Sequence, residues 1–285
     1  AAMKPAVTPS LTFARGFTLI ELMIVVSIIA IVAAVALPKL AGARLAANES
    51  NAIGTLRTIA TAETQTAANC SIDTNGDGAG DFNGVTQKLG YLQELGITAL
   101  WLMPIFPSPS YHGYDVTDYY DVNPQYGTMD DFKNLVAEAR KRDIHIIIDL
   151  VINHTSDKHP QSPYRDWYIW NETDLKYEGP WGQRVWHSST TGFYYGIFEA
   201  FMPDLNYANP AVTEEMKKIA AFWLTDVGVD GFRLDAAKHL IEDGVKQENT
   251  EATHLWYQNE FYPTYKAVNP EAMTVGELFG DGLNT

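Results

Sequence analysis

The feature that most constrains the fold is a short apolar segment, Gly231–Asp235, that ends in a carboxylate. Its composition favours a buried β-strand. Because side chains alternate along a strand, Arg233 and Asp235 lie on one face, opposite the apolar side chains. A neighbouring arginine favours the charged form of an acid, so we expect Asp235 to be ionised. A charged carboxylate at the end of a buried strand suits nucleophilic catalysis, and an Arg–Asp pair that only supports the fold is the alternative.

Strand and helix patterns alternate along the second part of the chain, as is typical of an α/β fold with a parallel sheet. Apolar runs predict strands at 97–103, 144–152, 231–235 and 272–277. Helices with N-caps at Thr128 and Asn209 lie between these strands. Since two of the strands end in carboxylates, Asp235 and Glu277, and active residues of (β/α) barrels lie at strand C-termini, we predict a barrel.

Four segments resemble, in the same order, the signatures of the α-amylase family, glycoside hydrolase family 13. They are 149–154 (DLVINH), 202–206 (MPDLN), 231–239 (GFRLDAAKH) and 274–277 (TVGE). The resemblance covers roughly residues 72–277. It implies a (β/α)8 TIM barrel, incomplete within 70–285, in which only strands 2–5 can be identified.

By the same resemblance, Asp235 is the nucleophile and Glu277 the general acid/base of a retaining glycosidase that acts on α-linked glucans such as starch and maltooligosaccharides. Such enzymes need two carboxyl groups about 5–5.5 Å apart, which neighbouring barrel strands can supply. Asp149 is expected to pair with Arg233. The resemblance also implies a set of substrate-binding residues: Tyr114, Asp115, His154, Arg233, Lys238 and His239.

The resemblance further implies a small domain B, inserted at about 155–206. This segment is too long for a plain loop and is rich in aromatic residues, including Trp167, Trp170, Trp181 and Trp186. Its tryptophans could stack on sugar faces or form the core of the inserted domain. Linkage specificity, and hydrolysis against transglycosylation, stay open.

The segment 73–81 (DTNGDGAGD) places oxygen side chains at alternate positions, with glycines that permit tight turns, and this suits a hard cation such as Ca²⁺. An EF-hand loop would need Glu at its twelfth position, where this chain has Gly84. The resemblance implies calcium or magnesium binding here, and a plain turn is the alternative. It also assigns Asn153, and the carbonyl of His239, to a structural calcium site. The candidate metal residues are Asp73, Asn75, Asp77, Ala79, Asp81 and Asn153.

The first residues of the chain resemble a different family. After a polar leader, 1–16, the run 17–37 is almost wholly apolar and would span about 31 Å as a helix, close to a bilayer core. The segment 15–22 (RGFTLIEL) resembles a type IV prepilin site, which implies cleavage after Gly16, methylation of Phe17 and pairing of Glu21 with a neighbouring subunit's amine.

The pilin-like helix is expected over 17–69. This resemblance implies contact with the membrane, self-assembly, and location in a bacterial inner membrane or at the cell surface or pilus. A generic transmembrane anchor is the alternative. Without a genuine N-terminal segment, the protein would be secreted or cytoplasmic.

The charge composition limits the classes of molecule that the chain is expected to bind. The formal net charge is −15, which argues against a nucleic-acid partner and suits a neutral substrate. The single Cys70 excludes an intrachain disulfide.

Three interpretations follow from these two resemblances. The chain is a glycoside hydrolase, a type IV pilin-like subunit with a replaced head, or a non-natural chimera joined near 69–72 by engineering, misassembly or misprediction.

We expect the purified 285-residue chain to show little or no glycosidase activity by itself, because half a barrel leaves two open sheet edges and an uncovered apolar interior. Release of reducing sugar from starch and maltooligosaccharides measures this. Robust hydrolysis would contradict the expectation.

Overall fold

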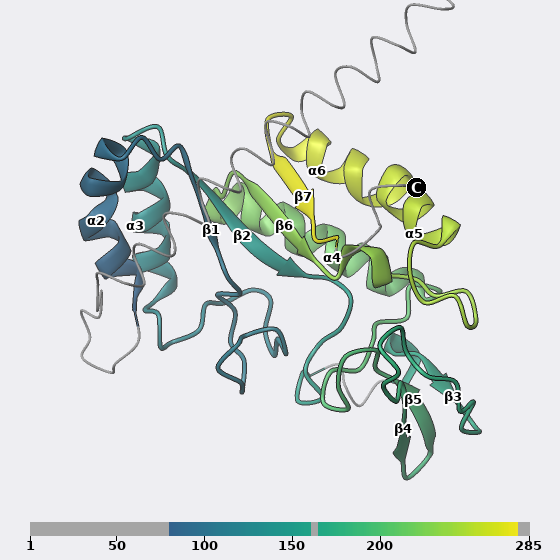
Figure 1. Ribbon diagram of the computed structural model, residues 1–285. Coiled ribbons are helices and arrows are strands. Elements are labelled where there is room, and N and C mark those ends of the chain that lie inside the picture. The colour runs from purple at the N-terminus through teal and green to yellow at the C-terminus, as the bar shows by residue number, and fades with distance from the viewer. Residues whose placement is uncertain (1–79, 161–164, 279–285) are drawn as a thin grey trace, which may run out of the picture. The chain divides into compact units, whose positions relative to one another are not determined.

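The computed structural model describes residues 80–160 and 165–278 of the chain (Figure 1). The leader, the pilin-like helix at 17–69 and the processing residues Gly16, Phe17 and Glu21 lie outside the described residues. So does most of the candidate cation loop, namely Asp73, Asn75, Asp77 and Ala79. Within the described ranges no helix has the length and apolar character needed to cross a membrane.

The centre of the fold is a four-stranded parallel sheet in the order β1-β2-β6-β7. The strands are β1 (Ala99–Leu102), β2 (His145–Val151), β6 (Gly231–Asp235) and β7 (Met273–Gly276). Each lies inside or at the bounds of a predicted strand, which confirms the α/β class. Among the described residues the sheet is open, with β1 and β7 at its edges.

Helices precede the first strand and connect the others, since parallel pairing requires crossover connections. They are α2 (Phe82–Glu94), α3 (Met129–Arg140), α4 (Pro210–Phe222), α5 (Glu251–Trp256) and α6 (Tyr262–Val268), with π-helical turns at Trp223–Val227 and Tyr257–Phe261. The predicted caps are confirmed. Thr128 accepts a hydrogen bond from the backbone of Asp131 and completes a capping box, and Asn209 accepts one from Ala211.

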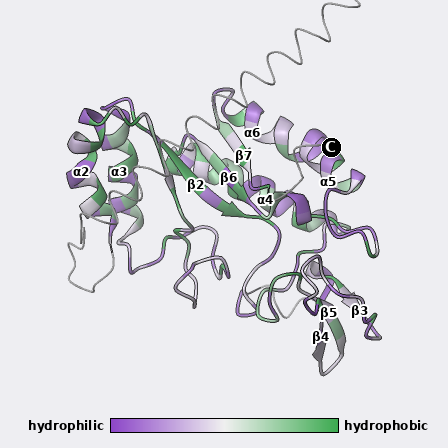
Figure 2. Cartoon of the chain, in the orientation of Figure 1, coloured by the Kyte–Doolittle hydropathy of each residue, from purple (hydrophilic) through white to green (hydrophobic). Residues whose placement is uncertain are grey.

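The main core lies between the sheet and these helices. In β2 every residue after His145 is buried, and most of the strand is coloured as hydrophobic in Figure 2, with His145 and Asp149 as its hydrophilic residues. The largest fully buried side chain is Trp223, whose indole N–H donates to the carbonyl of Tyr119 at 2.7 Å. Phe106 and Phe132 pack against its ring. The other side of the sheet has a smaller apolar cluster around Ala99 and Ile147.

A second, antiparallel sheet lies between β2 and α4 in the sequence. Its order is β3-β5-β4, formed by β3 (Trp170–Asn171), β5 (Gly192–Tyr195) and β4 (Trp186–Ser189), and a short 3-10 turn (Arg165–Trp167) precedes it. This segment has its own small core, which includes Trp186 and Tyr195. Its position in the chain and its separate core fit the inserted domain expected at about 155–206.

The segment after Asp235 differs from the pattern of strand followed directly by helix. Ala236 has a left-handed backbone (φ 50°), and only a short 3-10 turn, Ala237–His239, follows it. The next α-helix, α5, begins at Glu251, where Thr250 caps it. A left-handed residue interrupts helical geometry, so the chain turns immediately beyond the carboxylate.

Candidate active site

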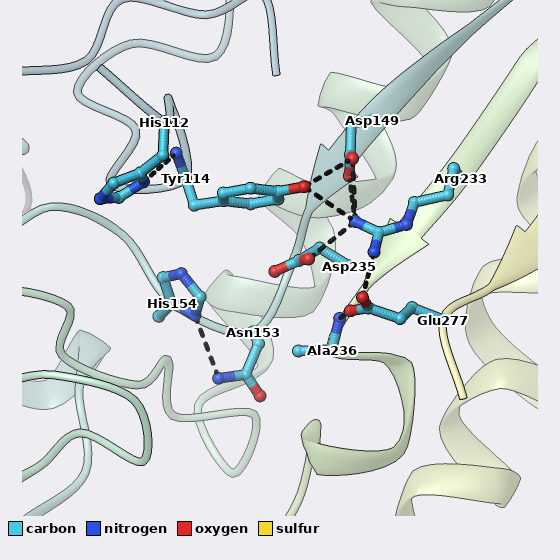
Figure 3. Close-up of polar contacts among 9 residues, drawn as sticks. All are labelled: His112, Tyr114, Asp149, Asn153, His154, Arg233, Asp235, Ala236 and Glu277. Carbon is cyan, nitrogen blue, oxygen red and sulfur yellow. Dashed lines mark hydrogen bonds and ion pairs between the residues drawn. The ribbon is translucent and has the colours of Figure 1, made fainter. Parts of the chain in front are cut away.

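Arg233 is the centre of a cluster of three carboxylates. Its Nη1 lies 2.8 and 2.9 Å from the two carboxylate oxygens of Asp149 and 2.7 Å from Oδ1 of Asp235. Its Nη2 lies 2.5 Å from Oε1 of Glu277. The expected pairing of Asp149 with Arg233 is therefore confirmed, and Figure 3 shows all three acids directed toward the guanidinium.

The strand register brings these groups together. Asp149 on β2 pairs directly with Arg233 on β6, and Asp235 ends the same strand two residues later. Glu277 follows β7, and its backbone N–H donates to the carbonyl of Leu234 at 2.9 Å. Oε2 of Glu277 accepts a hydrogen bond from the backbone of Ala236 at 3.2 Å. The C-terminal ends of three neighbouring strands thus supply the whole cluster.

The cluster carries more negative than positive charge. Burial, then the charge of Asp149, raises the pKa of Asp235, and Arg233 only partly offsets this. Burial also raises the pKa of Asp149 to about 6. The expectation that the arginine alone keeps Asp235 ionised is therefore wrong for the free site. One guanidinium cannot neutralise two buried acids and the partly buried Glu277, so the cluster retains a proton more readily than an exposed carboxylate does.

Aromatic side chains lie beside the cluster. The hydroxyl of Tyr114 donates to Asp149 at 3.3 Å, and the ring of His112 stacks on that of Tyr114 at 6.0 Å between centroids. The indole ring of Trp101 lies 5.1 Å from the guanidinium carbon of Arg233, within cation–π range. Tyr114 thus presents its ring beside the carboxylates while its hydroxyl fixes Asp149.

His154 lies on the other side of Asp235 in Figure 3. Burial lowers the pKa of His154 to about 4, so its imidazole is neutral near pH 7. Nδ1 lies 3.3 Å from the side-chain nitrogen of Asn153, which is a donor, so Nδ1 accepts and Nε2 carries the proton. That Nε2 has no hydrogen-bond partner among the described residues. His154 is therefore a neutral hydrogen-bond donor, and a backbone hydrogen bond with Tyr114 partly offsets the fall in its pKa.

The other predicted substrate residues lie outside the carboxylate cluster. Asp115 is buried and accepts hydrogen bonds from the hydroxyls of Ser108 and Ser110, which fixes its loop. Lys238 pairs with Glu248 at 2.5 Å. His239 donates from Nδ1 to the carbonyl of Gln247 at 2.8 Å.

The two candidate metal residues that the structure describes, Asp81 and Asn153, lie in separate parts of the fold. Asp81 is buried and caps α2, accepting from the backbone of Gly84 at 2.7 Å. Asn153 is buried next to Asp204, with 3.0 Å between its side-chain nitrogen and Oδ2 of Asp204. Within the described ranges no group of three or more His, Cys, Asp or Glu side chains is arranged to hold a metal. The ligand that Asn153 offers to a metal ion is its amide oxygen, because its amide nitrogen is a hydrogen-bond donor.

One acid that the sequence analysis did not assign lies near Asp204. Glu242 is half-buried as a residue, but both of its carboxylate oxygens are buried and neither has a hydrogen-bond partner among the described residues. Burial, then the charge of Asp204, raises the pKa of Glu242 well above its ordinary value. Oδ1 of Asn153 is also buried without a partner in this part of the chain. These unsatisfied oxygens are hard ligands and fit a hard cation such as Ca²⁺.

The signal for Glu242 was present in the sequence. Glu242 directly follows the apolar residues Leu240 and Ile241, so that a charged residue stands at the end of a short apolar run. A lone acid in such a run does not by itself indicate a ligand, and only the fold places it near Asp204.

Comparison with known proteins gives two family matches. The model for "Alpha amylase, catalytic domain" matches residues 69–285, and that for "Prokaryotic N-terminal methylation motif" matches residues 12–37. Alpha-amylase 3 of Dictyoglomus thermophilum is 50% identical over 216 residues, which is 73% of this chain and 41% of that protein. Trehalose synthase/amylase TreS of Mycolicibacterium smegmatis is 44% identical over 206 residues, 65% of this chain and 34% of that protein.

Solved structures of related enzymes also match this chain in sequence and fold. The α-amylase of H. orenii is 46% identical with a TM-score of 0.65, covering 73% of this chain and 45% of that one. A trehalose-6-phosphate hydrolase of Bacillus licheniformis is 33% identical with a TM-score of 0.68, covering 74% and 43%. The chain spans less than half the length of each of these relatives.

We predict that Arg233→Ala destabilises the protein by about 3–5 kcal/mol near neutral pH, because the buried Asp149 and Asp235 and the partly buried Glu277 lose their counter-charge. The effect should shrink at about pH 4.5. The raised pKa values of Asp149 and Asp235 mean that the folded state holds extra protons, so their stabilising contribution is present at low pH and is lost as pH rises. Chemical denaturation at both pH values measures this.

Arg140→Ala is the control, because Arg140 is mostly exposed and lies 4.0 Å from its acidic partner, Asp230. A loss of stability for Arg233→Ala that is equal at both pH values would contradict the proposed balance of charge.

Proposed function

The chain belongs to the α-amylase family, and we propose that Asp235 and Glu277 are the catalytic pair of a retaining glycoside hydrolase acting on α-linked glucans. The observation that carries the proposal is the convergence of these two carboxylates, from neighbouring parallel strands, on the single guanidinium of Arg233. The names of the relatives include an α-amylase, a trehalose synthase/amylase and 4-α-glucanotransferases, whose substrates share α-linked glucose.

In this mechanism Asp235 attacks the anomeric carbon while Glu277 donates a proton to the departing glycosidic oxygen. Water then attacks the glycosyl–Asp235 ester, and Glu277 takes its proton. Arg233 contacts both groups and holds them in place, and its positive charge favours the ionised form of Asp235.

Tyr114 and His154 hold the sugar that is cleaved. The ring of Tyr114 lies beside the carboxylates and offers a flat apolar surface, while its hydroxyl is engaged by Asp149. His154 offers the proton on Nε2 to a sugar hydroxyl. Because burial keeps His154 neutral, it donates this hydrogen bond without adding a positive charge beside the developing oxocarbenium ion.

We expect 5-fluoro-α-glucosyl fluoride to label Asp235 covalently in the full chain, because its glycosyl–enzyme ester forms but is hydrolysed slowly. Mass spectrometry of the digested protein locates the ester, and it detects a single turnover even where steady-state activity is low. Asp235→Asn should abolish the label. Asp230→Asn is the matched control, since Asp230 immediately precedes the same strand at its other end. A label on another residue, or one that persists in Asp235→Asn, would contradict the assignment.

We also propose that Asn153, Asp204 and Glu242 hold a Ca²⁺ ion, with the carbonyl of His239 as a further candidate ligand. The buried oxygens of Asn153 and Glu242 lack partners among the described residues, whereas Asp204 accepts from the backbone of Ile197 and from Asn153. Two of the three groups are acids that burial makes costly to ionise without a cation. When bound, the cation supplies structural charge compensation between the inserted segment and the turn after β6. The loop that begins at Asp73 and ends at the helix cap Asp81 stays a second candidate cation site.

We expect Ca²⁺ to raise the thermal midpoint of the full chain, and Glu242→Gln to lose most of that rise because the variant lacks one charged ligand. Without Ca²⁺ the variant should be at least as stable as the parent, since it removes a buried acid with no partner among the described residues. Differential scanning calorimetry with Ca²⁺, Mg²⁺ and EDTA measures both. Glu248→Gln, at a more exposed glutamate, is the control. An unchanged Ca²⁺ effect in Glu242→Gln would overturn this site.

A second candidate function rests on the methylation motif at residues 12–37. We propose that the chain is processed after Gly16, that Phe17 becomes the methylated N-terminus, and that Glu21 pairs with a neighbouring subunit in a membrane-associated or surface filament. A non-natural join near residues 69–72 is the remaining interpretation of the two matches.

Mass spectrometry of the protein from a bacterial host with a prepilin peptidase tests this second function. We expect a mature N-terminus at Phe17 with one added methyl group, and Gly16→Ala should block cleavage. An uncut N-terminus in the parent chain would favour the enzyme or chimera interpretation.

A further inference from the structure

The residues that follow β2 carry part of the proposed site, but they lie beyond the end of the central sheet. The pairing of β2 with β6 stops at Val151, opposite Asp235. Asn153 and His154 come directly afterwards, and both are buried. Buried backbone carbonyls need hydrogen-bond donors, so those beyond the paired residues depend on groups from elsewhere in the fold.

Two tyrosine hydroxyls supply these donors. The hydroxyl of Tyr119 lies 2.7 Å from the carbonyl of Val151 and 3.0 Å from that of His154, so its single proton serves two acceptors. The hydroxyl of Tyr207 donates to the carbonyl of Ile152, between them in the sequence. The backbone that leads to His154 is therefore held by phenol groups where the sheet ends.

Tyr119 is itself fixed by the main core. It precedes α3, is only 3% exposed, and its ring lies 5.4 Å from that of Phe106. Its backbone carbonyl accepts the indole N–H of Trp223 at 2.7 Å. Burial raises the pKa of Tyr119 well above its ordinary value, so the hydroxyl remains a donor at neutral pH.

Tyr207 reaches the same backbone from another part of the chain, just before α4. Its ring packs edge to face against that of Trp256, with 4.9 Å between the centroids. The indole N–H of Trp256 donates to Thr213 on α4 at 2.9 Å, which fixes the indole in turn. Burial also raises the pKa of Tyr207 well above its ordinary value, so it too is a donor at neutral pH.

These contacts restrain the direction in which the imidazole of His154 points. The inserted segment holds His154 through a backbone bridge with Asp204 and through the ring of Phe198, 5.3 Å from the imidazole. Tyr119 holds the carbonyl of His154 from the main core. Because the peptide unit is planar, a fixed carbonyl limits rotation about the backbone bond next to the side chain.

We propose that Tyr119 and Tyr207 are positioning residues for the glucan site, because their hydroxyls fix the backbone that aims the imidazole of His154 at the sugar. This rests on the proposed hydrolase function, in which His154 donates a hydrogen bond to a sugar hydroxyl. The two tyrosines act through His154 and not by contact with the sugar. Misplacement of one such hydrogen bond changes a rate or binding constant by about tenfold.

Tyr119→Phe tests this role, because it removes the hydroxyl and keeps the ring in the core. We expect the second-order rate of labelling by 5-fluoro-α-glucosyl fluoride to fall about tenfold in the full chain. In a chain that already carries His154→Ala, the same substitution should change the rate by less than about twofold, since the group that Tyr119 positions is gone. Tyr265→Phe is the matched control, because Tyr265 is also buried and its hydroxyl accepts from Thr274 at 2.8 Å.

Equilibrium binding gives the same double-mutant cycle without turnover. In the full chain carrying Asp235→Asn, isothermal titration with maltotriose should show about tenfold weaker binding with Tyr119→Phe, and little further loss when His154→Ala is already present. Circular dichroism and the thermal midpoint establish that each variant is folded. Tyr207→Phe enters the same cycle, and it carries the test by itself where Tyr119→Phe does not fold.

The outcomes separate this role from the hydrolase function. Equal losses with and without His154, or no loss in a folded variant, show that the hydroxyls only stabilise the fold and overturn the positioning role. Absence of labelling at Asp235, together with maltotriose binding that shows the coupling to His154, overturns the hydrolase function and supports the positioning role. Absence of both labelling and binding overturns both proposals.

Discussion

The structure around the site depends on one buried guanidinium. Arg233 contacts Asp149, Asp235 and Glu277, which come from three strands, so it couples their positions more tightly than backbone pairing alone. Buried charges are costly unless they are paired, and here the pairing is incomplete because three acids share one arginine. That imbalance, together with burial, raises the pKa values of Asp149 and Asp235.

The inserted segment has its own small apolar core and also joins the main core through Tyr168 and Leu205. Its polar and aromatic contacts include Asp204 with Asn153 and Trp181 with His239. Unsatisfied oxygens of Asn153 and Glu242 occur at the same junction. The proposed cation site therefore lies at the junction of the inserted segment with the rest of the fold.

The chain combines matches to two families whose physical requirements differ. The methylation motif at residues 12–37 belongs to an apolar segment, whereas the amylase match at residues 69–285 belongs to an acidic α/β domain. The two proposed functions depend on different residues, because proposed processing at Gly16 and proposed chemistry at Asp235 use residues far apart in the sequence. Each is therefore open to test without reference to the other.

The sequence alone determined the local features. Apolar runs and caps such as Thr128 and Asn209 predicted the strands and helices well, because these signals act over a few residues. Alternation along β6 placed Arg233 and Asp235 on one face, and the family signatures identified Glu277 as a candidate site residue.

The tertiary structure decided the features that depend on residues distant in the sequence. The register that puts three acids on one arginine, the raised pKa of Asp235 from burial and Asp149, the unsatisfied Glu242 and the exposed Trp181 all arise from long-range packing. Burial and through-space charge are properties of the folded chain, so no local pattern encodes them.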